Sequence, residues 1–393
     1  MNYPKSLPEP SSDALAHSQK LVGKIRNEID ANSGSISFRR YMEMALYEPA
    51  LGYYVSGLHK IGSQGDFVTA PEISPLFSLC LAEQCKEILS TLKDDTPEVD
   101  ILELGAGSGA MAATILKELE RQNSLPESYY ILDLSPDLKQ RQKETIDKHV
   151  PHLLERVKWI SKLPENFIGV ILGNEVLDAM PVDIFTQQNE VIYEHHVIWK
   201  ENKLVEELQP ANERLNKKVL SLDISHKATP YTSEVNPNLN AWFDALSKSM
   251  DKGVVILADY GYTEAEYYLE ERNKGTLICH YQHLVNEAPL SYSGLQDITS
   301  NVDFTAVAKS ADKAGFDVSG YITQANFLTN AELESFFMNS FQETPSEQFQ
   351  LSQQVRKLSL PSEMGERFKF IGLSKAYKKS LKGFSQMDLR HKL

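Results

Sequence analysis

The chain has 393 residues, of which 41% are hydrophobic and 24% charged, fractions that are typical of a folded globular protein. Its 40 Lys and Arg against 54 Asp and Glu give a net charge of −14, which argues against a nucleic-acid-binding protein, because binding to phosphates needs a cationic surface. Three cysteines are too few for a disulfide framework, and no apolar run approaches the ~20 residues of a membrane span.

The N-terminal segment MNYPKSLPEPSSD contains acidic residues and no apolar core, so it is typical of neither a secretory signal nor a transit peptide. We therefore expect a cytoplasmic protein from a bacterium. Apolar residues at helical spacing predict helices over residues 14–31 and 75–92. Between them, residues 51–75 contain several glycines and predict a functional loop, or lid. We predict that residues 1–94 form an N-terminal helical region with this lid.

From residue 97 onwards, short apolar runs alternate with helical segments, which is typical of an α/β fold with a parallel sheet. The strands are continuously apolar, as burial on both faces of a parallel sheet requires. The predicted strands cover residues 99–104, 129–134, 157–160, 168–172 and 254–258, and the predicted helices between them cover residues 109–122 and 136–148.

About 80 residues separate the strand that ends at Leu172 from the strand that begins at Val254, far more than a crossover connection needs. We predict an inserted subdomain at residues 186–250. The Rossmann-like domain around it then comprises residues 95–185 and 251–393. The other predicted elements are strands at 191–199 and 368–373 and helices at 239–250, 304–314 and 332–337.

The strongest motif is ILELGAGSGAMAATILKEL, which follows the first predicted strand. Gly105, Gly107 and Gly109 stand where the backbone turns towards the N-terminus of a helix, and glycine there lets a ligand approach the main chain. The motif fits the GxGxxG/A pattern of dinucleotide enzymes. It also fits a GxGxG pattern with an acid two residues before it, Glu103, as in enzymes that use S-adenosylmethionine. A cationic sulfonium and amino group favour that nearby carboxylate, whereas a pyrophosphate does not.

Polar side chains also follow two other predicted strands. Asp133 ends the strand in YYILDLS, where a carboxylate can accept hydrogen bonds from both ribose hydroxyls; the alternative is that it marks the start of the next helix. Asn174, Glu175 and Asp178 in GNEVLDAMPVDIF follow another strand, at the edge where open α/β sheets bind ligands. The alternative is that they cap a short helix. A ribose occurs in both NAD and S-adenosylmethionine, so Asp133 alone does not separate these cofactors.

The order of these motifs, together with GDFVTAPEISPLF, YTSEVN, DYG and DITSNVDF, resembles the MidA-type family from about Arg39 to Leu328. That family includes the mitochondrial complex I assembly factor that methylates an arginine. The resemblance implies a class I methyltransferase fold with a Rossmann-like seven-stranded sheet and an N-terminal helical region. It also implies S-adenosylmethionine as the cofactor and an arginine of a partner protein as the acceptor. As the partner, the resemblance suggests a subunit of a respiratory complex. Asp133 stands where we expect Glu in many relatives.

For transfer to arginine, Glu175 and Asp178 are the candidate catalytic residues, because two carboxylates can hold and polarise a guanidinium group. They share a face only if their segment is helical. The candidates for binding the cofactor are Glu103, Gly105, Gly107, Gly109, Asp133 and Asn174. The candidates for the lid or the substrate are Asp66, Thr69 and Glu72, with Glu234 of YTSEVN from the insert. No His or Cys spacing favours a metal site.

Two other functions remain open at this point. The chain could serve as an assembly or adaptor protein with a structural cofactor site, because the long insert could bind a partner. It could also be a methyltransferase that acts on a small molecule, since a fold does not fix its substrate. The sequence leaves the oligomeric state open.

Overall fold

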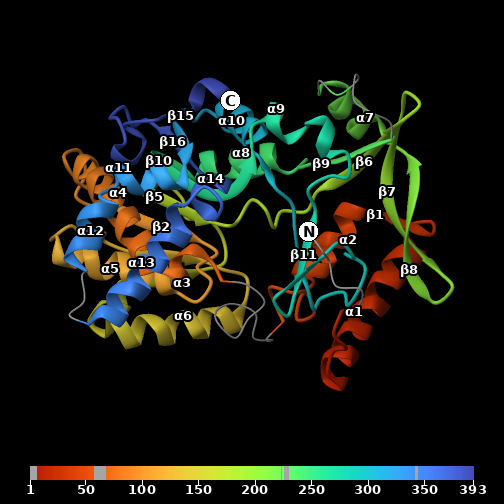
Figure 1. Ribbon diagram of the computed structural model, residues 1–393, viewed down its shortest axis with the longest axis horizontal. Helices are drawn as coiled ribbons and strands as arrows, with labels where there is room; N and C mark the ends of the chain where they lie inside the picture. The colour runs from red at the N-terminus through yellow and green to blue at the C-terminus, as the bar shows by residue number, and fades with distance from the viewer. Residues whose placement is uncertain (1–6, 57–67, 223, 225–229, 341–343) are drawn as a thin grey trace. The chain divides into compact units, whose positions relative to one another are not determined.

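The computed structural model describes residues 7–56, 68–222, 224, 230–340 and 344–393 (Figure 1). The chain divides into two compact units, each built from segments that are distant in the sequence. Unit 1 comprises Met1–Phe67, Asp178–Asn238 and Tyr262–Asp303. Unit 2 comprises Val68–Leu177, Leu239–Gly261 and Phe304–Leu393. The glycine motif belongs to unit 2.

A mixed β-sheet lies at the centre of unit 2. Its strands are β2 (Asp100–Leu104), β3 (Tyr129–Leu132), β4 (Val157–Ile160), β5 (Phe167–Asn174), β10 (Met250–Tyr262), β15 (Asp317–Thr323) and β16 (Phe368–Lys375). They follow one another in the order β15-β16-β10-β5-β2-β3-β4, and the two-residue β14 (Val302–Asp303) lies off this path. The strands from β4 to β10 pair in parallel, whereas β16 is antiparallel to both β10 and β15. The predicted α/β organisation with parallel central strands is confirmed.

Helices of unit 2 cover this sheet. The helices are α3 (Ala70–Ile73), α4 (Pro75–Lys93), α5 (Ala110–Arg121), α6 (Pro136–His149), α8 (Leu239–Ser249), α10 (Phe304–Lys313), α11 (Gln324–Asn330), α12 (Leu333–Asn339), α13 (Pro345–Ser359) and α14 (Met364–Arg367), with 3-10 turns at Pro151–Arg156, Lys382–Phe384 and Arg390–Lys392. Several helices begin as the sequence dictates: Ser74 and Ser135 accept hydrogen bonds at the N-termini of α4 and α6, each of which has proline at its first position.

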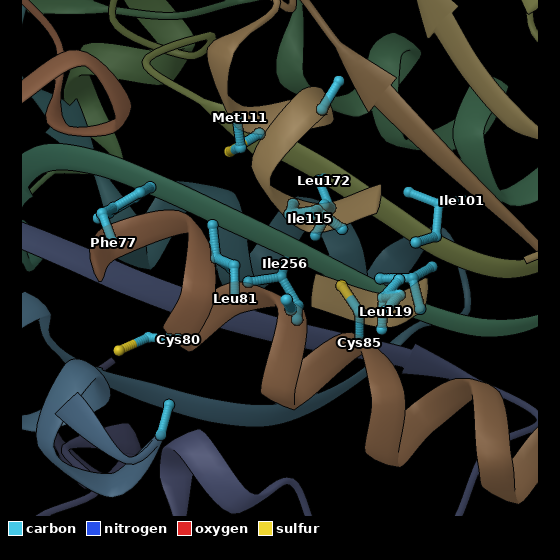
Figure 2. Close-up of a cluster of buried hydrophobic side chains, with 14 of the residues drawn as sticks. Phe77, Cys80, Leu81, Cys85, Ile101, Met111, Ile115, Leu119, Leu172 and Ile256 are labelled. Carbon is cyan, nitrogen blue, oxygen red and sulfur yellow. The ribbon is translucent and has the colours of Figure 1, made fainter. Parts of the chain in front are cut away.

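Both faces of the sheet are buried, because successive strand residues point to opposite faces. On one face Ile101, Leu172 and Ile256 lie in one core cluster with residues of α4 and α5, as Figure 2 shows. On the other face Leu102 and Leu257 are buried as well. Coverage of both faces is what the continuously apolar strands predicted.

Two of the cysteines lie in this core (Figure 2). Cys80 and Cys85 of α4 are free thiols, fully buried among apolar side chains. Burial raises the pKa of both thiols well above the usual range, which disfavours the reactive thiolate. The predicted packing role of Cys85 is confirmed.

Unit 1 contains two small sheets. Its strands are β1 (Ser35–Ser37), β6 (Asp183–Gln188), β7 (Val191–Lys200), β8 (Lys203–Pro210), β9 (Tyr231–Val235), β11 (Ile278–Tyr281), β12 (Leu284–Asn286) and β13 (Asp297–Thr299), and its helices are α1 (Ser12–Ala31), α2 (Phe38–Tyr47), α7 (Glu213–Leu220) and α9 (Glu264–Tyr267), with a 3-10 turn at Glu270–Arg272. One sheet has the order β1-β7-β6-β9, with β8 beside β7, and the other has the order β12-β11-β13.

The units differ from the domain boundaries that we predicted. β1 pairs with β7, so the N-terminal region and the predicted insert share one sheet. The predicted insert 186–250 ends with α8, which belongs to unit 2, and residues 262–303 join unit 1. The reason is non-local strand pairing, which leaves no trace in the periodicity of either segment.

Most predicted elements are confirmed to within a few residues, including α1, α4, β2, β5 and β16. We did not predict α13 from the sequence. Only Leu351 and Leu358 are buried in this helix, so its apolar stripe is weak. No helix in the described part of the chain is long and apolar enough to cross a membrane.

Candidate functional site

The glycine loop leads from β2 to α5 in unit 2. Gly105, Gly107 and Gly109 have φ values of 65°, 52° and 84°, in the left-handed region that favours glycine. A Cβ atom at Gly105 would meet only Val176 Cγ2, at 3.8 Å, so the space beside this residue is open. A Cβ atom at Gly109 would lie 2.9 Å from Gln142 Cα, so this glycine is required by the close approach of α6. Gly105 and Gly109 therefore have different physical roles.

Glu103 lies on β2, two residues before the loop, and is almost completely buried. The hydroxyl of Tyr129 on the neighbouring β3 donates to Glu103 Oε2 at 2.6 Å. Burial raises the pKa of Glu103, the Tyr129 hydrogen bond lowers it, and the charge of Asp133 raises it. The net result is a pKa of about 7. Glu103 is thus a buried carboxyl whose charge is sensitive to pH near neutrality.

We expect the Glu103→Gln substitution to stabilise the protein at alkaline pH. The folded pKa of about 7 lies above the usual glutamate value of 4.5, so the unfolded chain loses this proton first as the pH rises. Stability is then lost between about pH 4.5 and pH 7, by about 3 kcal/mol in total at 1.36 kcal/mol per pKa unit. Glutamine does not titrate and removes this loss.

Urea unfolding of both proteins at roughly pH 4 and roughly pH 8 measures the effect, because the linkage is absent below both pKa values. We expect the unfolding free energy of the variant minus that of the parent to be larger at the higher pH. An equal difference at both pH values would contradict the raised pKa.

Asp133 follows β3 and is part of a buried hydrogen-bond network. Its Oδ1 accepts from the backbone N–H of Ser135 at 3.0 Å, and its Oδ2 accepts from Gln142 Nε2 at 2.8 Å. Gln142 Nε2 also lies 3.2 Å from the carbonyl oxygen of Gly107, and Gln142 Oε1 accepts from Trp159 Nε1 at 3.0 Å. Burial raises the pKa of Asp133, and these hydrogen bonds lower it. Gln142 thereby links the predicted ribose carboxylate to the glycine loop.

We did not predict a role for Gln142 from the sequence, although a signal existed. Gln142 lies four residues from both Leu138 and Ile146, on the inward stripe of α6, and it is fully buried. A polar residue at an apolar position of a helix must find hydrogen-bond partners. Those partners come from three other segments, so the sequence could indicate only that they exist.

Asp133→Ala is expected to weaken S-adenosylmethionine binding by roughly 1–3 kcal/mol, or about 5- to 150-fold, through lost ribose hydrogen bonds. Titration calorimetry measures this directly. Asp137→Ala is the matched control, because it removes the same charge from the exposed first turn of α6. Unchanged affinity in Asp133→Ala would remove the ribose assignment.

The carboxyl end of β5 carries the third group of predicted residues. The amide of Asn174 donates to Glu175 Oε1 at 2.9 Å, and Asn174 Oδ1 is buried with no hydrogen-bond partner among the described residues. Glu175 has a φ of 53°, a region that is uncommon for residues other than glycine and that clusters at functional sites. Its backbone N–H donates to the carbonyl oxygen of Ala258 at 2.9 Å, which fixes this conformation.

Asp259 holds the loop that follows Glu175. It is fully buried on β10, and its Oδ2 and Oδ1 accept from the backbone N–H groups of Leu177 and Tyr260, both at 2.9 Å. We did not assign a role to Asp259 from the sequence. Its position after the predicted strand 254–258 is the same signal that identified Asp133 and Asn174.

Asp178 belongs to unit 1, whereas Glu175 belongs to unit 2. The segment between them contains no helix, because the Glu175 and Leu177 N–H groups bond to Ala258 and Asp259 instead of to preceding carbonyls. The helical reason for placing Glu175 and Asp178 on one face therefore fails. Asp178 is buried, and its carbonyl oxygen accepts from the Ser300 N–H at 3.0 Å.

The predicted lid residues have separate positions. Asp66 lies outside the described residues. Thr69 precedes α3 without a side-chain cap, and Glu72 lies within this short helix. Ser108 of the glycine loop hydrogen-bonds to the carboxyl of Glu72, and burial outweighs this bond to raise the Glu72 pKa. Glu72 therefore lies against the glycine loop, inside unit 2.

Glu234 has a structural position within unit 1. Its buried carboxylate accepts hydrogen bonds from the N–H groups of Thr276 and Leu277, at 2.8 and 3.1 Å, and from the Tyr267 hydroxyl at 3.1 Å. A Cβ atom at Gly275 would lie 2.2 Å from Glu234 Oε1. The sequence suggested Glu234 as a residue that could reach in from the insert towards the substrate, and this stays a prediction. In the structure its carboxylate anchors the loop at residues 275–277.

The edge of the sheet in unit 2 fits S-adenosylmethionine. β2 lies between β3 and β5, so the carboxyl ends of these strands bring Asp133, the glycine loop and Asn174 to one edge. Asp133 is the carboxylate that we predict to bind the ribose, Gly105 leaves open space beside the loop, and Asn174 has a buried amide oxygen without a hydrogen-bond partner among the described residues. These groups match the polar atoms of the cofactor.

Comparisons with known proteins agree with this geometry. The family described as "Putative S-adenosyl-L-methionine-dependent methyltransferase" matches residues 80–322. Similar proteins named "Protein arginine methyltransferase NDUFAF7, mitochondrial" occur in Danio rerio, 28% identical over 87% of this chain and 84% of the relative, and in Homo sapiens, 28% identical over 93% and 84%.

A crystal structure of a Burkholderia thailandensis protein bound to S-adenosyl-homocysteine is similar over 99% of this chain and 100% of that chain, with 37% identity and a TM-score of 0.92. The native structure of such a protein from the same organism has 37% identity, the same coverage and a TM-score of 0.90. The similarity therefore extends over both units and includes a protein that binds the demethylated form of the predicted cofactor.

Proposed function

The chain belongs to the MidA-type family of S-adenosyl-L-methionine-dependent methyltransferases, and we propose that its methyl acceptor is an arginine side chain of a partner protein. Its fold is that of a class I methyltransferase, and its cofactor is S-adenosylmethionine. The family match and the similar structure bound to S-adenosyl-homocysteine therefore favour S-adenosylmethionine over the dinucleotide that the GxGxxG/A pattern also allowed. The names of the mitochondrial relatives support a protein arginine as the acceptor.

The observation that carries the proposal is the position of Glu175. Its backbone is held in a left-handed conformation at the carboxyl end of β5, and Asn174 orients its carboxylate. A guanidinium group is cationic and poorly nucleophilic, so it needs a carboxylate that holds it and polarises one nitrogen. A residue kept in an uncommon conformation at a ligand-binding edge is well suited to that task.

The mechanism we propose is direct in-line transfer. S-adenosylmethionine supplies a methyl group on a sulfonium, which is already a good leaving group. The protein then contributes mainly positioning and electrostatics. Asp133 holds the ribose, the glycine loop admits the cofactor, and Glu175 orients the acceptor nitrogen and takes up the proton that it releases. Asp178 is the second candidate carboxylate.

The partner is a protein substrate, and the resemblance suggests a subunit of a respiratory complex. The expected bacterial cytoplasmic location stays a prediction. Incubation of the protein with methyl-labelled S-adenosylmethionine and proteins of its source cell, followed by acid hydrolysis of labelled protein, tests the proposal. We expect methylarginine. Label in a small molecule would instead support the small-molecule alternative, and cofactor binding without transfer would support the adaptor alternative.

A further inference from the structure

Glu72 lies on the short helix α3 of unit 2, and the mechanism above does not use its carboxyl group. The carbonyl oxygen of Thr69 accepts from the N–H groups of Glu72 and Ile73, at 3.0 and 3.1 Å. Pro71 stands in the first turn, where its missing N–H costs no helical hydrogen bond. Ala70 is fully buried, and Ile73 packs against the same core cluster. These bonds and apolar contacts fix the position of Glu72.

The carboxyl group of Glu72 meets the glycine loop. α3 packs against α5, the helix that this loop enters, and Ser108 of the loop hydrogen-bonds to the Glu72 carboxyl. Glu72 Oε2 is buried and has no hydrogen-bond partner among the described residues. A buried carboxylate oxygen without a donor costs free energy, so a bound ligand that brings a donor to this oxygen recovers that cost.

The chemistry of the cofactor indicates which of its groups fits this oxygen. S-adenosylmethionine carries two cationic groups, a sulfonium and the α-ammonium of its methionine part. The sulfonium has no N–H or O–H to donate, whereas an ammonium combines its charge with three N–H donors. The ribose hydroxyls already have Asp133 as their predicted acceptor, and the adenine is neutral. Hydrogen bonds between two charged groups are the stronger ones, so the α-ammonium matches the free oxygen of Glu72 best.

Glu103 is the other carboxylate near the loop, and its surroundings differ. Glu103 is two residues after Ile101 on β2, so both side chains point to the sheet face that packs against α4 and α5. It is 1% exposed, and the Tyr129 hydroxyl already donates to its Oε2. Glu72 instead approaches the loop from outside the sheet, with a carboxylate oxygen that lacks a donor among the described residues.

We propose that Glu72 binds the α-ammonium group of the cofactor, and that Ser108 orients its carboxylate for this purpose. The proposal concerns the cofactor and is independent of the acceptor that we propose above. It predicts that Glu72 contributes to the affinity only for ligands that carry the amino group.

Calorimetric titration of the full chain with three probes tests this assignment. The probes are S-adenosyl-homocysteine, its analogue without the amino group, and its analogue without the carboxyl group. Glu72→Gln keeps the side-chain shape and removes the charge. We expect it to weaken binding of the two amino-bearing probes by about tenfold or more, as is typical for loss of a hydrogen bond between charged groups. Binding of the probe without the amino group should not change.

Ser108→Ala and Glu334→Gln complete the test. Ser108→Ala removes the hydrogen bond that orients Glu72 and should weaken the two amino-bearing probes by about threefold to tenfold. Glu334 is exposed on α12 in unit 2, so Glu334→Gln makes the same change in net charge and should leave all three affinities unchanged.

Three results would overturn the assignment. Equal weakening of all three probes by Glu72→Gln would mean a structural role, such as pairing with Arg141 of α6, whose charge acts on Glu72. Unchanged affinity for S-adenosyl-homocysteine would exclude any contact. A loss specific to the amino group in Glu103→Gln, but not in Glu72→Gln, would give the role to Glu103.

The two proposals fail in distinguishable ways. Absence of methyl transfer to any arginine, with the expected probe selectivity in Glu72→Gln, would contradict the proposed function and leave the role of Glu72 intact. Formation of methylarginine by the parent protein, with no probe selectivity in Glu72→Gln, would do the reverse.

Discussion

Gly107→Val is expected to abolish binding of S-adenosylmethionine. Gly107 has a φ of 52°, and its carbonyl oxygen faces the Gln142 amide at 3.2 Å, which connects the loop to Asp133. A β-branched residue is strained in the left-handed region by roughly 1–3 kcal/mol, and its side chain would stand where the ligand meets the backbone. We expect the dissociation constant, measured by calorimetry, to rise about 100-fold or beyond detection.

Gly315→Val provides the matched control for backbone strain. Gly315 has a φ of 89° in unit 2, and a Cβ atom there would have no heavy atom within 4 Å. The control should lower stability without changing cofactor affinity. If Gly107→Val bound the cofactor as well as Gly315→Val does, close approach of the ligand at Gly107 would be refuted.

Gly109→Val should behave differently from Gly107→Val. The added side chain would collide with the backbone of Gln142, only 2.9 Å from its Cβ position, so α5 and α6 would have to separate. We therefore expect a lower melting temperature together with weaker binding. This comparison separates a glycine needed for packing from a glycine needed by the ligand.

Glu175→Gln is expected to reduce turnover by about 10²–10³, equivalent to roughly 2.7–4 kcal/mol, while leaving cofactor affinity unchanged. The amide keeps the shape of the carboxylate and can still interact with Asn174, but it cannot pair its charge with a guanidinium group or take up its proton. Single-turnover methyl transfer and calorimetric titration measure the two quantities separately. Loss of cofactor binding would place Glu175 in the cofactor site.

Glu332→Gln is the control for this substitution. Glu332 also has a positive φ, 71°, and its carboxylate forms an ion pair with Lys382 at 2.7 Å in unit 2. Like Glu175→Gln, the Glu332→Gln substitution removes one negative charge from unit 2, and it should leave turnover unchanged. Asp178→Asn should lower turnover in the same way as Glu175→Gln. Full activity in both Glu175→Gln and Asp178→Asn would contradict the proposal that a carboxylate holds the acceptor.

Local sequence patterns determined the organisation of unit 2. Apolar runs and helical spacing located β2, β5, β10 and most helices, because burial on both faces imposes composition on each strand separately. The position of Asp133 and Asn174 after their strands then indicated the ligand-binding edge, since parallel strands bring their carboxyl ends together. These properties follow from chain order and periodicity alone.

Only the tertiary structure decided how distant segments meet. In the tertiary structure, β1 pairs with β7, and the carboxylate of Glu234 accepts a hydrogen bond from the loop at residues 275–277. Gln142 connects Asp133 to Gly107. The tertiary structure also brings together Tyr54 and Asp297, which are 243 residues apart in the chain. Periodicity reports which face of an element is buried, but a hydrogen bond depends on the partner that packing brings within about 3 Å. That partner comes from another segment, and no local pattern specifies it.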